Sequence, residues 1–490
     1  MSCEQEPTYY ADALNSIADR QLVRLAVPGH SADRSAAPRL AEYVGERVLQ
    51  LDVTPLTPEL DLGPDSPLEK SRAAAARAFE ARRTWFVTNG ASQGNRIAAL
   101  AVGQLGAPEQ PFVVQRSAHS SMFDGAVLAG LSLAFVMPEI DTVHGINHGI
   151  TPGAFRDALA DNPNAKAAYV ISPSYFGAVA DIPALSEIAH AAGIPLIVDA
   201  AWAAHFGFHP DLPANPLTQG ADLVVSSTHK LGGSLTQSAM VHLGFGPYAD
   251  VLEPLIDRAY RMTASTSTSS VLTASLDIAR AELCGGESAI GRSIRAADRL
   301  RDAVRAHTLL DVVSDGYDRF PGIVGHDPMH VAIDVRGVGL TGHAVRNRLL
   351  CEHDIYVEIA TNTCIVALIG PGYEPDAGRI VAAIASMAVD TADEALVLTA
   401  SNLPEPGFAA MRPRDAFFAA TELVHHTEAV GRVSADALAA YPPGIPNVLP
   451  GEIITAEIVD FVRAIAGSPG GYVRGAADTA VDHFRVVSGR

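Results

Sequence analysis

The sequence predicts an α/β protein built on a seven-stranded, mainly parallel sheet. Short apolar runs recur between residues 84 and 245, and Ala-rich segments with helical spacing separate them. Each run is continuously apolar instead of alternating, which is typical of strands that helices bury on both faces. We therefore expect one doubly wound layer. Its expected strands are 84–90, 111–116, 133–139, 167–173, 195–201, 221–227 and 238–244.

The rest of the chain predicts three further units beside this large domain, which we expect over residues 31–290. Residues 1–30 indicate an N-terminal arm, and a smaller α+β domain is expected over 291–400. The stretch SNLPEPG (401–407) indicates a linker, with a C-terminal unit over 401–490. The elements expected in the smaller domain are a linking helix at 277–308, strands at 329–335, 356–360 and 364–370, and helices at 342–354 and 376–395.

Length and charge narrow the class of protein. A chain of 490 residues, 48% hydrophobic and 18% charged, is long enough for two or three domains. Its 35 basic and 55 acidic residues give a net charge of −20, which would repel a phosphate backbone, so we expect no nucleic-acid partner. No apolar run is long enough for a membrane span and the N-terminus lacks a signal-peptide layout, so we expect no membrane partner and a cytoplasmic protein.

Cysteine and histidine positions give no sign of a metal or a disulfide framework. The scattered cysteines lack Cys-x-x-Cys spacing and predict free thiols in a reducing cytosol; they are Cys3, Cys284, Cys351 and Cys364. His205 and His209 fall in a Phe/Gly/Pro-rich stretch without a nearby acidic ligand, so we expect no metal site there. His425–His426 and the basic run 292–305 are interpreted as solvated helix faces.

The small number of lysines points to one of them as a reactive amine. Among the 35 basic residues only Lys70, Lys166 and Lys230 are lysines, and an arginine cannot replace a Schiff-base lysine because it does not deprotonate usefully. Lys230 ends the stretch SSTHK just past a predicted buried strand, where an α/β sheet presents its ligands. The alternative is a surface lysine that merely follows a strand.

Three further features lie at the ends of other predicted strands. Asp199 ends an apolar strand, where a buried carboxylate needs a cationic partner such as a protonated pyridine nitrogen; a helix N-cap is the alternative. The turn TNGASQGNR (88–96) offers Ser92 and free helix amides to an anion, although the chain has neither a nucleotide P-loop nor a dinucleotide fingerprint. His119 could stack on a planar ring or could be merely packed. Together with Lys230, these features predict one pocket for a phosphorylated pyridine aldehyde.

The chain resembles the Orn/Lys/Arg decarboxylase family in its short form. The resemblance covers about 450 residues, and the lysine block and the YPPGIP…PGE block are its specific motifs. The matching stretches are VPGH (27–30), TNGASQGN (88–95), RSAHSS (116–121), SPSYFG (172–177), VDAAW (198–202), SSTHKLGGSLTQSAMVH (226–242), STSSVLTASLDIAR (267–280), and AVGRVSADAL with AYPPGIPNVLPGE (429–452). The resemblance implies a fold of PLP-dependent fold type I (aspartate-aminotransferase-like) and pyridoxal 5'-phosphate (PLP) as cofactor.

The resemblance also implies a role for each matching residue. Lys230 would bind the cofactor as an imine, Asp199 would pair with the pyridine nitrogen and His119 would stack on the ring. The remaining cofactor contacts would be Ala201 beneath the ring, Trp202 near its phenolic oxygen, Ser92, Ser227, His229 and the Ala91 amide at the phosphate, and Ser267, Thr268 or Ser269 from a partner subunit. The protein would then be at least a homodimer.

The implied activity is decarboxylation of lysine, ornithine or arginine to the amine and carbon dioxide, in polyamine biosynthesis and amino acid metabolism. Lys230 or His229 would return a proton to Cα, and Glu358 would hold the distal cation of the substrate unless it is a surface residue.

The chain departs from the family pattern at substrate-side positions. Ser31 and Ser120 stand where the family often has lysine, Ile359 follows Glu358 where lysine is usual, and AAWAAHFGFHP (200–210) mixes patterns of different subgroups. These departures leave an aminotransferase, a lyase or a decarboxylase-oxidase on the same cofactor as the alternative activity, and a cofactor-free scaffold as a non-enzymatic one.

Overall fold

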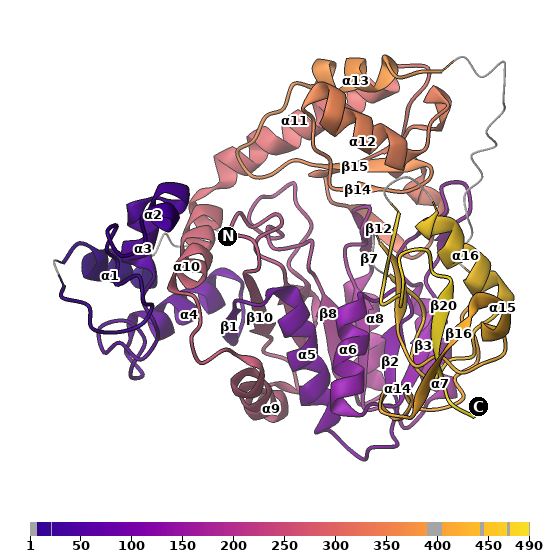
Figure 1. Cartoon of the computed structure of the whole chain (residues 1–490), viewed down its shortest axis with the longest axis horizontal. Helices are drawn as coiled ribbons and strands as arrows, with labels where there is room; N and C mark the ends of the chain where they lie inside the picture. Colours follow the sequence, from indigo (N-terminus) through magenta and orange to yellow (C-terminus); the bar gives the residue numbers. More distant parts are fainter. Residues whose placement is uncertain (1–6, 21, 390–403, 442–444, 468–470, 490) are drawn as a thin grey trace.

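The computed structural model contains the predicted seven-stranded sheet and confirms the fold class (Figure 1). The structure describes residues 7–20, 22–389, 404–441, 445–467 and 471–489. Six strands of the sheet run in the same direction, and β10 is antiparallel to both of its neighbours. In spatial order the strands are β1 (Arg83–Val87), β10 (Ala239–Leu243), β9 (Leu223–Ser226), β8 (Leu196–Asp199), β6 (Ala167–Ile171), β2 (Phe112–Gln115) and β3 (Leu133–Val136).

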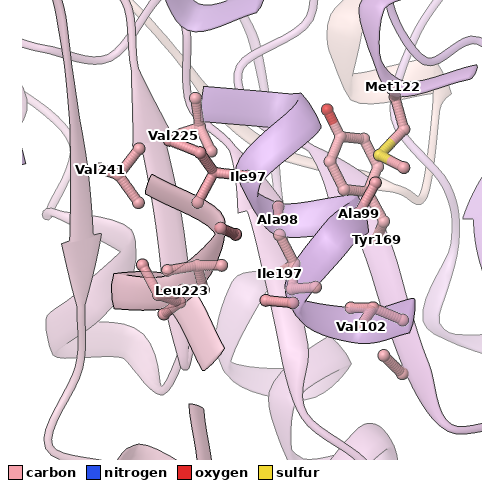
Figure 2. Close-up of a cluster of buried hydrophobic side chains, with 14 of the residues drawn as sticks. Ile97, Ala98, Ala99, Val102, Met122, Tyr169, Ile197, Leu223, Val225 and Val241 are labelled. Carbon is pink, nitrogen blue, oxygen red and sulfur yellow. The ribbon is translucent and has the colours of Figure 1, made fainter. Parts of the chain in front are cut away.

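The apolar runs are continuous because successive strand residues feed two separate cores. Tyr169, Ile197 and Leu223 pack on one face of the sheet, where Figure 2 shows them with Ile97 and Val102 of a covering helix. Their chain neighbours enter the core on the other face. The helices of the first face are α5 (Gly90–Gly103), α6 (Ser120–Ala129) and α9 (Ala249–Thr263), and those of the second are α7 (Pro152–Asp161) and α8 (Ile182–Ala191).

Helix α5 lies so close to the sheet that it requires a glycine. A Cβ on Gly94 would sit 2.6 Å from Cγ1 of Val225 in β9. The close approach brings the first turn of α5 to the carboxyl end of the sheet, beside the ends of β8 and β9.

The smaller α+β unit lies above this end of the sheet in Figure 1. Its antiparallel sheet has the order β11 (Asp311–Val312), β13 (His330–Asp334), β15 (Cys364–Leu368) and β14 (Ile359–Ala360). Helices α11 (Glu287–Arg305), α12 (Gly342–His353) and α13 (Ala377–Ala385) complete it. The helix expected over 376–395 thus ends earlier, and residues 390–395 lie outside the described part of the chain.

The single linking helix expected over 277–308 is wrong, because the structure has two helices, α10 (Ser270–Gly285) and α11, on either side of Gly286. A Cβ on Gly286 would lie 2.4 Å from the carbonyl oxygen of Glu282, so the chain turns where only glycine fits. The expectation of a solvated basic run at 292–305 also fails at Arg301. This side chain is buried and donates to the carbonyls of Pro328 and His330 at 2.8 and 2.7 Å.

Helix α1 (Tyr9–Ala18) of the N-terminal arm packs against the large domain. Helices α1, α2 (Pro38–Val44), α3 (Glu46–Leu51) and α4 (Pro67–Ala78) lie beside α10 (Figure 1). The amide of Tyr10 donates to Asp277 at 2.9 Å, and Asp277 pairs with Arg280 at 2.8 Å. This buried pair anchors α1 to α10.

The C-terminal part of the chain packs against the sheet beyond β2 and α6. Its elements are α14 (Pro413–Phe417), β16 (Thr421–His425), α15 (His426–Ala429), β17 (Leu438–Tyr441), β18 (Ile445–Val448), α16 (Ala456–Ala466), β19 (Tyr472–Arg474) and β20 (His483–Val487). A buried ion pair joins Arg116, just after β2, to Glu452 at 3.0 Å, and Arg116 also donates to the carbonyl of Pro446 at 2.7 Å. The YPPGIP…PGE block is therefore held against the segment that leads to His119. Of the expected linker 401–407, residues 401–403 lie outside the described chain.

The cysteine expectation is partly wrong. Cys284 is disulfide-bonded, whereas Cys351 and Cys364 are free thiols, and Cys3 lies outside the described residues. Scattered spacing could not show this bond, because disulfide partners are set by the tertiary fold. In the described ranges, no helix is both long and apolar enough to cross a bilayer.

A buried histidine connects the large and small domains. His144 follows the short strand β4 (Ile140–Asp141), and its ring nitrogens lie 2.6 Å from Asp141 Oδ2 and 3.5 Å from Asp334 Oδ2 of β13. Burial alone would lower the pKa of His144, but its hydrogen bonds to the two carboxylates outweigh this and raise the pKa to about 9. The charged imidazole is thus held between two domains, near the hairpin that β4 forms with β5 (Ile146–Asn147).

This raised pKa predicts a loss of stability at alkaline pH. Because the pKa of His144 is raised in the folded protein, its contribution is complete below the unfolded value of about 6.5 and is lost as the pH rises through about 9. We expect wild type to lose about 2 kcal/mol relative to His144→Gln across that window, a figure discounted for partial solvation. Denaturant unfolding at several pH values measures this difference. The exposed His425→Gln serves as control, and a difference that stays constant with pH would contradict the assignment.

Candidate active site

A cavity of about 510 Å³ lies at the carboxyl end of the large sheet, roofed by the small and C-terminal parts of the chain. Ten of the predicted site residues line it: Ala91, Ser92, His119, Asp199, Ala201, Trp202, Ser227, His229, Lys230 and Glu358. Thr268 does not line it, since its hydroxyl donates to the carbonyl of Ser265 at 2.8 Å, and Ser269 caps α10. Within one chain, therefore, the STSS stretch is not part of this cavity, and its contact with a partner subunit stays a prediction.

A buried carboxylate occupies the floor of the cavity. Asp199 is 3% exposed, and its Oδ2 accepts hydrogen bonds from Tyr169 Oη at 2.7 Å and Asn95 Nδ2 at 3.0 Å. The amide of Ala201 donates to Oδ1 at 3.1 Å. All three donors are neutral, and Asp199 forms no ion pair with another residue that the structure describes. A buried carboxylate with neutral donors alone is the environment that a cationic ligand would complete.

His119 stands beside this carboxylate as a neutral ring. It caps α6, and its Nδ1 accepts the amide proton of Ser121 at 3.2 Å. Burial lowers the pKa of His119 to about 4, although Asp199 opposes that effect. Asn95 also donates to Ser121 Oγ at 3.0 Å, so one hydrogen-bond network orients both the carboxylate and the ring. A neutral imidazole fixed in this way can stack on a planar ligand.

Lys230 presents its amine to the same space. Its Nζ lies 3.2 Å from the centre of the Trp202 ring, close enough for a cation–π contact. Burial lowers the pKa of Lys230 to about 8, while the carboxylates of Asp199 and Glu358 act in the opposite direction. A lysine with such a pKa has a larger neutral fraction near neutral pH than an exposed lysine has, and the neutral amine is the form that attacks a carbonyl carbon.

The first turn of α5 offers unused donors to an anion. The Gly90 amide donates to the carbonyl of Gln237 at 2.7 Å, whereas the amides of Ala91 and Ser92 make no backbone hydrogen bond to another described residue. The N-cap, Asn89, gives the helix no side-chain hydrogen bond. The two amides and the helix dipole therefore form an anion site at the cavity wall, next to the Ser92 hydroxyl.

His229 is oriented by its own loop. Its Nδ1 lies 3.0 Å from the carbonyl oxygen of Ser238 and 3.2 Å from Ser227 Oγ. Because a carbonyl can only accept, Nδ1 carries the proton and Nε2 of the neutral ring keeps its lone pair. Burial lowers the pKa of His229, so this nitrogen can take up a proton and return it.

Several lining residues were not among the predicted ones. Asn95 and Gly90 had a signal, because both lie beside Ser92 within the quoted motif. Tyr169 does not line the cavity but donates to Asp199, and it sits in mid-strand among apolar residues, where no pattern marks it. Those that reach the cavity from elsewhere are Ile171, Tyr175, Arg346 of α12, Ile359 of β14 and Tyr472 of β19. Their arrival depends on how distant segments pack, which local patterns do not contain.

A cation next to His119 comes from the C-terminal part of the chain. Where the family often has lysine, this chain has Ser120, and Arg474 of β19 donates to Ser120 Oγ and to Asp124. The substitution at position 120 is therefore accompanied by an arginine from β19 at the same place.

The expectation that His205 lacks an acidic neighbour is wrong in three dimensions. Asp327 lies 3.1 Å from its Nε2, although the two residues are 122 positions apart. His209 pairs loosely with Asp211 at 3.7 Å. Over the described ranges, no group of three or more His, Cys, Asp and Glu side chains is arranged to hold a metal ion.

Comparison with known proteins places this geometry in one family. The sequence model of the Orn/Lys/Arg decarboxylase major domain matches residues 7–316, and that of the C-terminal domain matches residues 398–469. The arginine decarboxylase of Bacillus subtilis is 35% identical over 99% of both chains. The lysine decarboxylase of Hafnia alvei is 24% identical over 92% of this chain and 74% of its own length.

Solved structures show the same fold. Lysine decarboxylase A from Pseudomonas aeruginosa superposes with a TM-score of 0.82 at 21% identity, covering 99% of this chain and 81% of that one. A ureidoglycine–glyoxylate aminotransferase from Bacillus subtilis gives a TM-score of 0.52 at 15% identity, covering 65% of this chain and 84% of that one. About two thirds of the chain thus shares its fold with an aminotransferase, whereas almost the whole chain follows the lysine decarboxylase structure.

The lowered pKa of Lys230 predicts a distinctive reaction with amine reagents. In protein freed of any carbonyl ligand, we expect the rate of Lys230 modification to reach half its maximum near pH 8, since only the neutral amine reacts. Peptide mass spectrometry follows it beside the exposed Lys70. In Glu358→Gln the midpoint should move to lower pH, because a carboxylate that favours the charged amine is gone. A Lys230 midpoint near about 10.4 would show that the amine is not buried in this way.

Proposed function

The chain belongs to the Orn/Lys/Arg decarboxylase family and is a carboxy-lyase, and we propose that it decarboxylates a basic L-amino acid with pyridoxal 5'-phosphate as cofactor. Its relatives are named arginine and lysine decarboxylases, which supports a basic substrate. Arginine is the substrate we propose first, because arginine decarboxylase is the name of the relative that is 35% identical over the whole chain.

One observation carries the cofactor proposal: the Asp199 carboxylate is buried with neutral donors only, in the same cavity as the Lys230 amine. The protonated pyridine nitrogen of the cofactor would be the missing cation. The unused amides of Ala91 and Ser92 fit its phosphate, and His119 fits against its ring. When bound, the cofactor supplies an electron sink for the pair of electrons that the departing carboxyl group leaves behind.

The side chains of Lys230, Asp199 and His229 would each have a separate role in the reaction. Lys230 would hold the cofactor through its side-chain amine. Asp199 keeps the ring nitrogen protonated, because a neutral ring would leave the carboxylate buried without a countercharge. After carbon dioxide leaves, either the amine of Lys230 or Nε2 of His229 delivers a proton to Cα, and both groups have pKa values lowered by burial.

Glu358 is the proposed partner of the substrate's distal cation. It enters the cavity just before β14, and its charge acts on both Lys230 and His229. An acid on the small domain, opposite a cofactor held by the large domain, would draw the two domains together around a dicationic or guanidinium substrate.

A second candidate function is another reaction on the same cofactor, such as that of an aminotransferase, a lyase or a decarboxylase-oxidase. The observation that favours it is Arg346, which lines the cavity without a hydrogen bond or ion pair to another residue of the described chain. A guanidinium there could hold a carboxylate throughout the reaction, which favours an aminotransferase, or a lyase that retains the carboxyl group, over the decarboxylase-oxidase.

We also propose a cytoplasmic homodimer as the working unit. Val23, Leu25 and Val27 are 87%, 94% and 70% exposed in the single chain, so the segment offers apolar surface for a second copy to cover. A partner in that position could bring the STSS stretch to the phosphate site.

Product analysis tests the proposed reaction. Purified protein loaded with PLP should release carbon dioxide and a primary amine from arginine, lysine or ornithine, and Lys230→Ala should lose both the yellow imine and the turnover. Lys70→Ala is the matched control, because it changes an exposed lysine away from the cavity. Keto acid, ammonia or peroxide in place of amine would favour the second candidate, and activity retained by Lys230→Ala would refute its role.

Glu358→Gln should separate binding from chemistry. With a cationic substrate we expect KM to rise about 10- to 100-fold, because a charge-assisted hydrogen bond is lost, while kcat changes less. Steady-state kinetics with the substrate found above measure both constants. Glu352→Gln, an exposed acid on α12, is the control. Equal kinetics for Glu358→Gln and wild type would place the distal cation elsewhere.

A further inference from the structure

A buried cluster of titratable groups that the proposed mechanism does not use lies directly behind Trp202. It consists of His205, Asp327 and His330, which are 0%, 0% and 2% exposed. His205 comes from the loop after β8, Asp327 lies just before β13 of the small domain, and His330 is the first residue of that strand. We call these three residues the buried triad.

The carboxylate of Asp327 bridges the two imidazoles. Its Oδ1 lies 3.1 Å from His205 Nε2, and its Oδ2 lies 2.6 Å from His330 Nδ1. The amide of Met329 also donates to Oδ1 at 2.9 Å. Burial alone would raise the pKa of Asp327, but the two imidazoles outweigh it and hold that pKa below its ordinary range. The triad is therefore built around an ionised carboxylate.

Contacts on two sides fix the backbone that carries the His330 ring. Arg301 donates to the carbonyls of Pro328 and His330 at 2.8 and 2.7 Å, which fixes the segment from behind. Gly177 lies against it from the large domain, and a Cβ there would sit 2.7 Å from Cβ of His330. The two domains thus hold this imidazole from opposite sides.

The Trp202 ring lies between His330 and the amine of Lys230 and contacts both. The His330 imidazole meets the Trp202 indole edge to face, with centroids 5.4 Å apart and an interplanar angle of 80°. The Trp202 ring in turn lies 3.2 Å from Lys230 Nζ. Tyr175 also contacts Trp202, at 6.3 Å. His330 Nε2 has no hydrogen-bond partner in the described chain. Apart from the contact of Nδ1 with Asp327, the ring therefore interacts with its surroundings by packing against the indole.

We propose that the buried triad is a positioning unit that holds the Trp202 ring against the nitrogen of Lys230. The proposal rests on the proposed function in one respect, since it assigns Lys230 as the residue that binds the cofactor. Its consequence is electrostatic: the indole face stabilises a positive charge on that nitrogen, in addition to the carboxylates of Asp199 and Glu358 and against the burial of the site. A ring that tilts away would make the nitrogen lose its proton at lower pH.

The test is a pH titration of the visible imine band in the PLP-loaded protein. Asp327→Asn keeps the shape of the residue but removes the charge that both imidazoles share. We expect the midpoint of the titration to fall by about 0.5 to 1.5 pH units, the range that a cation–π contact represents. His330→Phe, which keeps an aromatic edge but not the hydrogen bond to Asp327, should shift the midpoint in the same direction and serves if Asp327→Asn does not fold.

Two controls separate positioning from a general loss of stability. His190→Phe removes another partly buried histidine–aspartate pair, to Asp222 at 2.8 Å, on the far side of the large domain from Trp202, and should leave the midpoint unchanged. In a Trp202→Leu background, Asp327→Asn should add no further shift, because the aromatic ring that transmits the effect is gone. An equal shift with and without Trp202, or none in either, would overturn the proposal.

A cofactor-free measurement keeps this result distinct from failure of the proposed function. The chain has two tryptophans, so Trp85→Phe leaves Trp202 as the single indole emitter. In that background Asp327→Asn should make Trp202 fluorescence more accessible to a neutral quencher, with or without PLP. If wild type forms no yellow imine but the quenching changes, the proposed function fails and the positioning unit stands. If quenching is unchanged, the positioning unit is refuted.

Discussion

The Asp199 carboxylate at the end of β8 is the constraint around which the site is built. The carboxylate lies in the interior and accepts hydrogen bonds from three neutral donors. These come from α5, from β6 and from the loop that follows β8. Asn95 extends the network to Ser121, and Ser121 orients His119. The hydrogen bonds of the Asp199 carboxylate therefore connect the first turns of α5, the strands β6 and β8, and the His119 ring. Without a cation the carboxylate is a costly group to bury, and the site is complete only when a ligand brings one.

Much of the fold could be predicted because its signals are local. The seven strands stand out as continuous apolar runs, since successive side chains enter two cores, and their ends coincide with the site residues. The break at Gly286 could not be predicted, because it depends on a carbonyl of the preceding turn that only glycine allows so near. Nor could the disulfide of Cys284 or the burial of Arg301, which is decided by carbonyl groups about 27 and 29 residues further on.

The residues of the site also fall into those that local sequence predicts and those that only tertiary packing brings together. Lys230, Asp199, His119 and the start of α5 follow strand ends, and a parallel sheet brings strand ends together whatever the detailed packing. Arg346 and Tyr472 sit on elements whose own sequence says nothing of a cavity, and they arrive there through domain packing. The partner of His205 is equally invisible from the sequence, since Asp327 is 122 residues away. Sequence patterns thus indicated the floor of the cavity and missed most of its roof.

The position of β19 has a consequence for how the protein is made. Tyr472 and Arg474 belong to the last twentieth of the chain, yet one lines the cavity and the other sits beside the start of α6. During synthesis the large sheet can assemble as soon as β10 has left the ribosome, but the wall over its carboxyl end waits for almost the whole polypeptide. A nascent or prematurely terminated chain without β19 therefore surrounds Lys230 with a lining that lacks Tyr472, and the complete wall forms only after β19 has joined the fold.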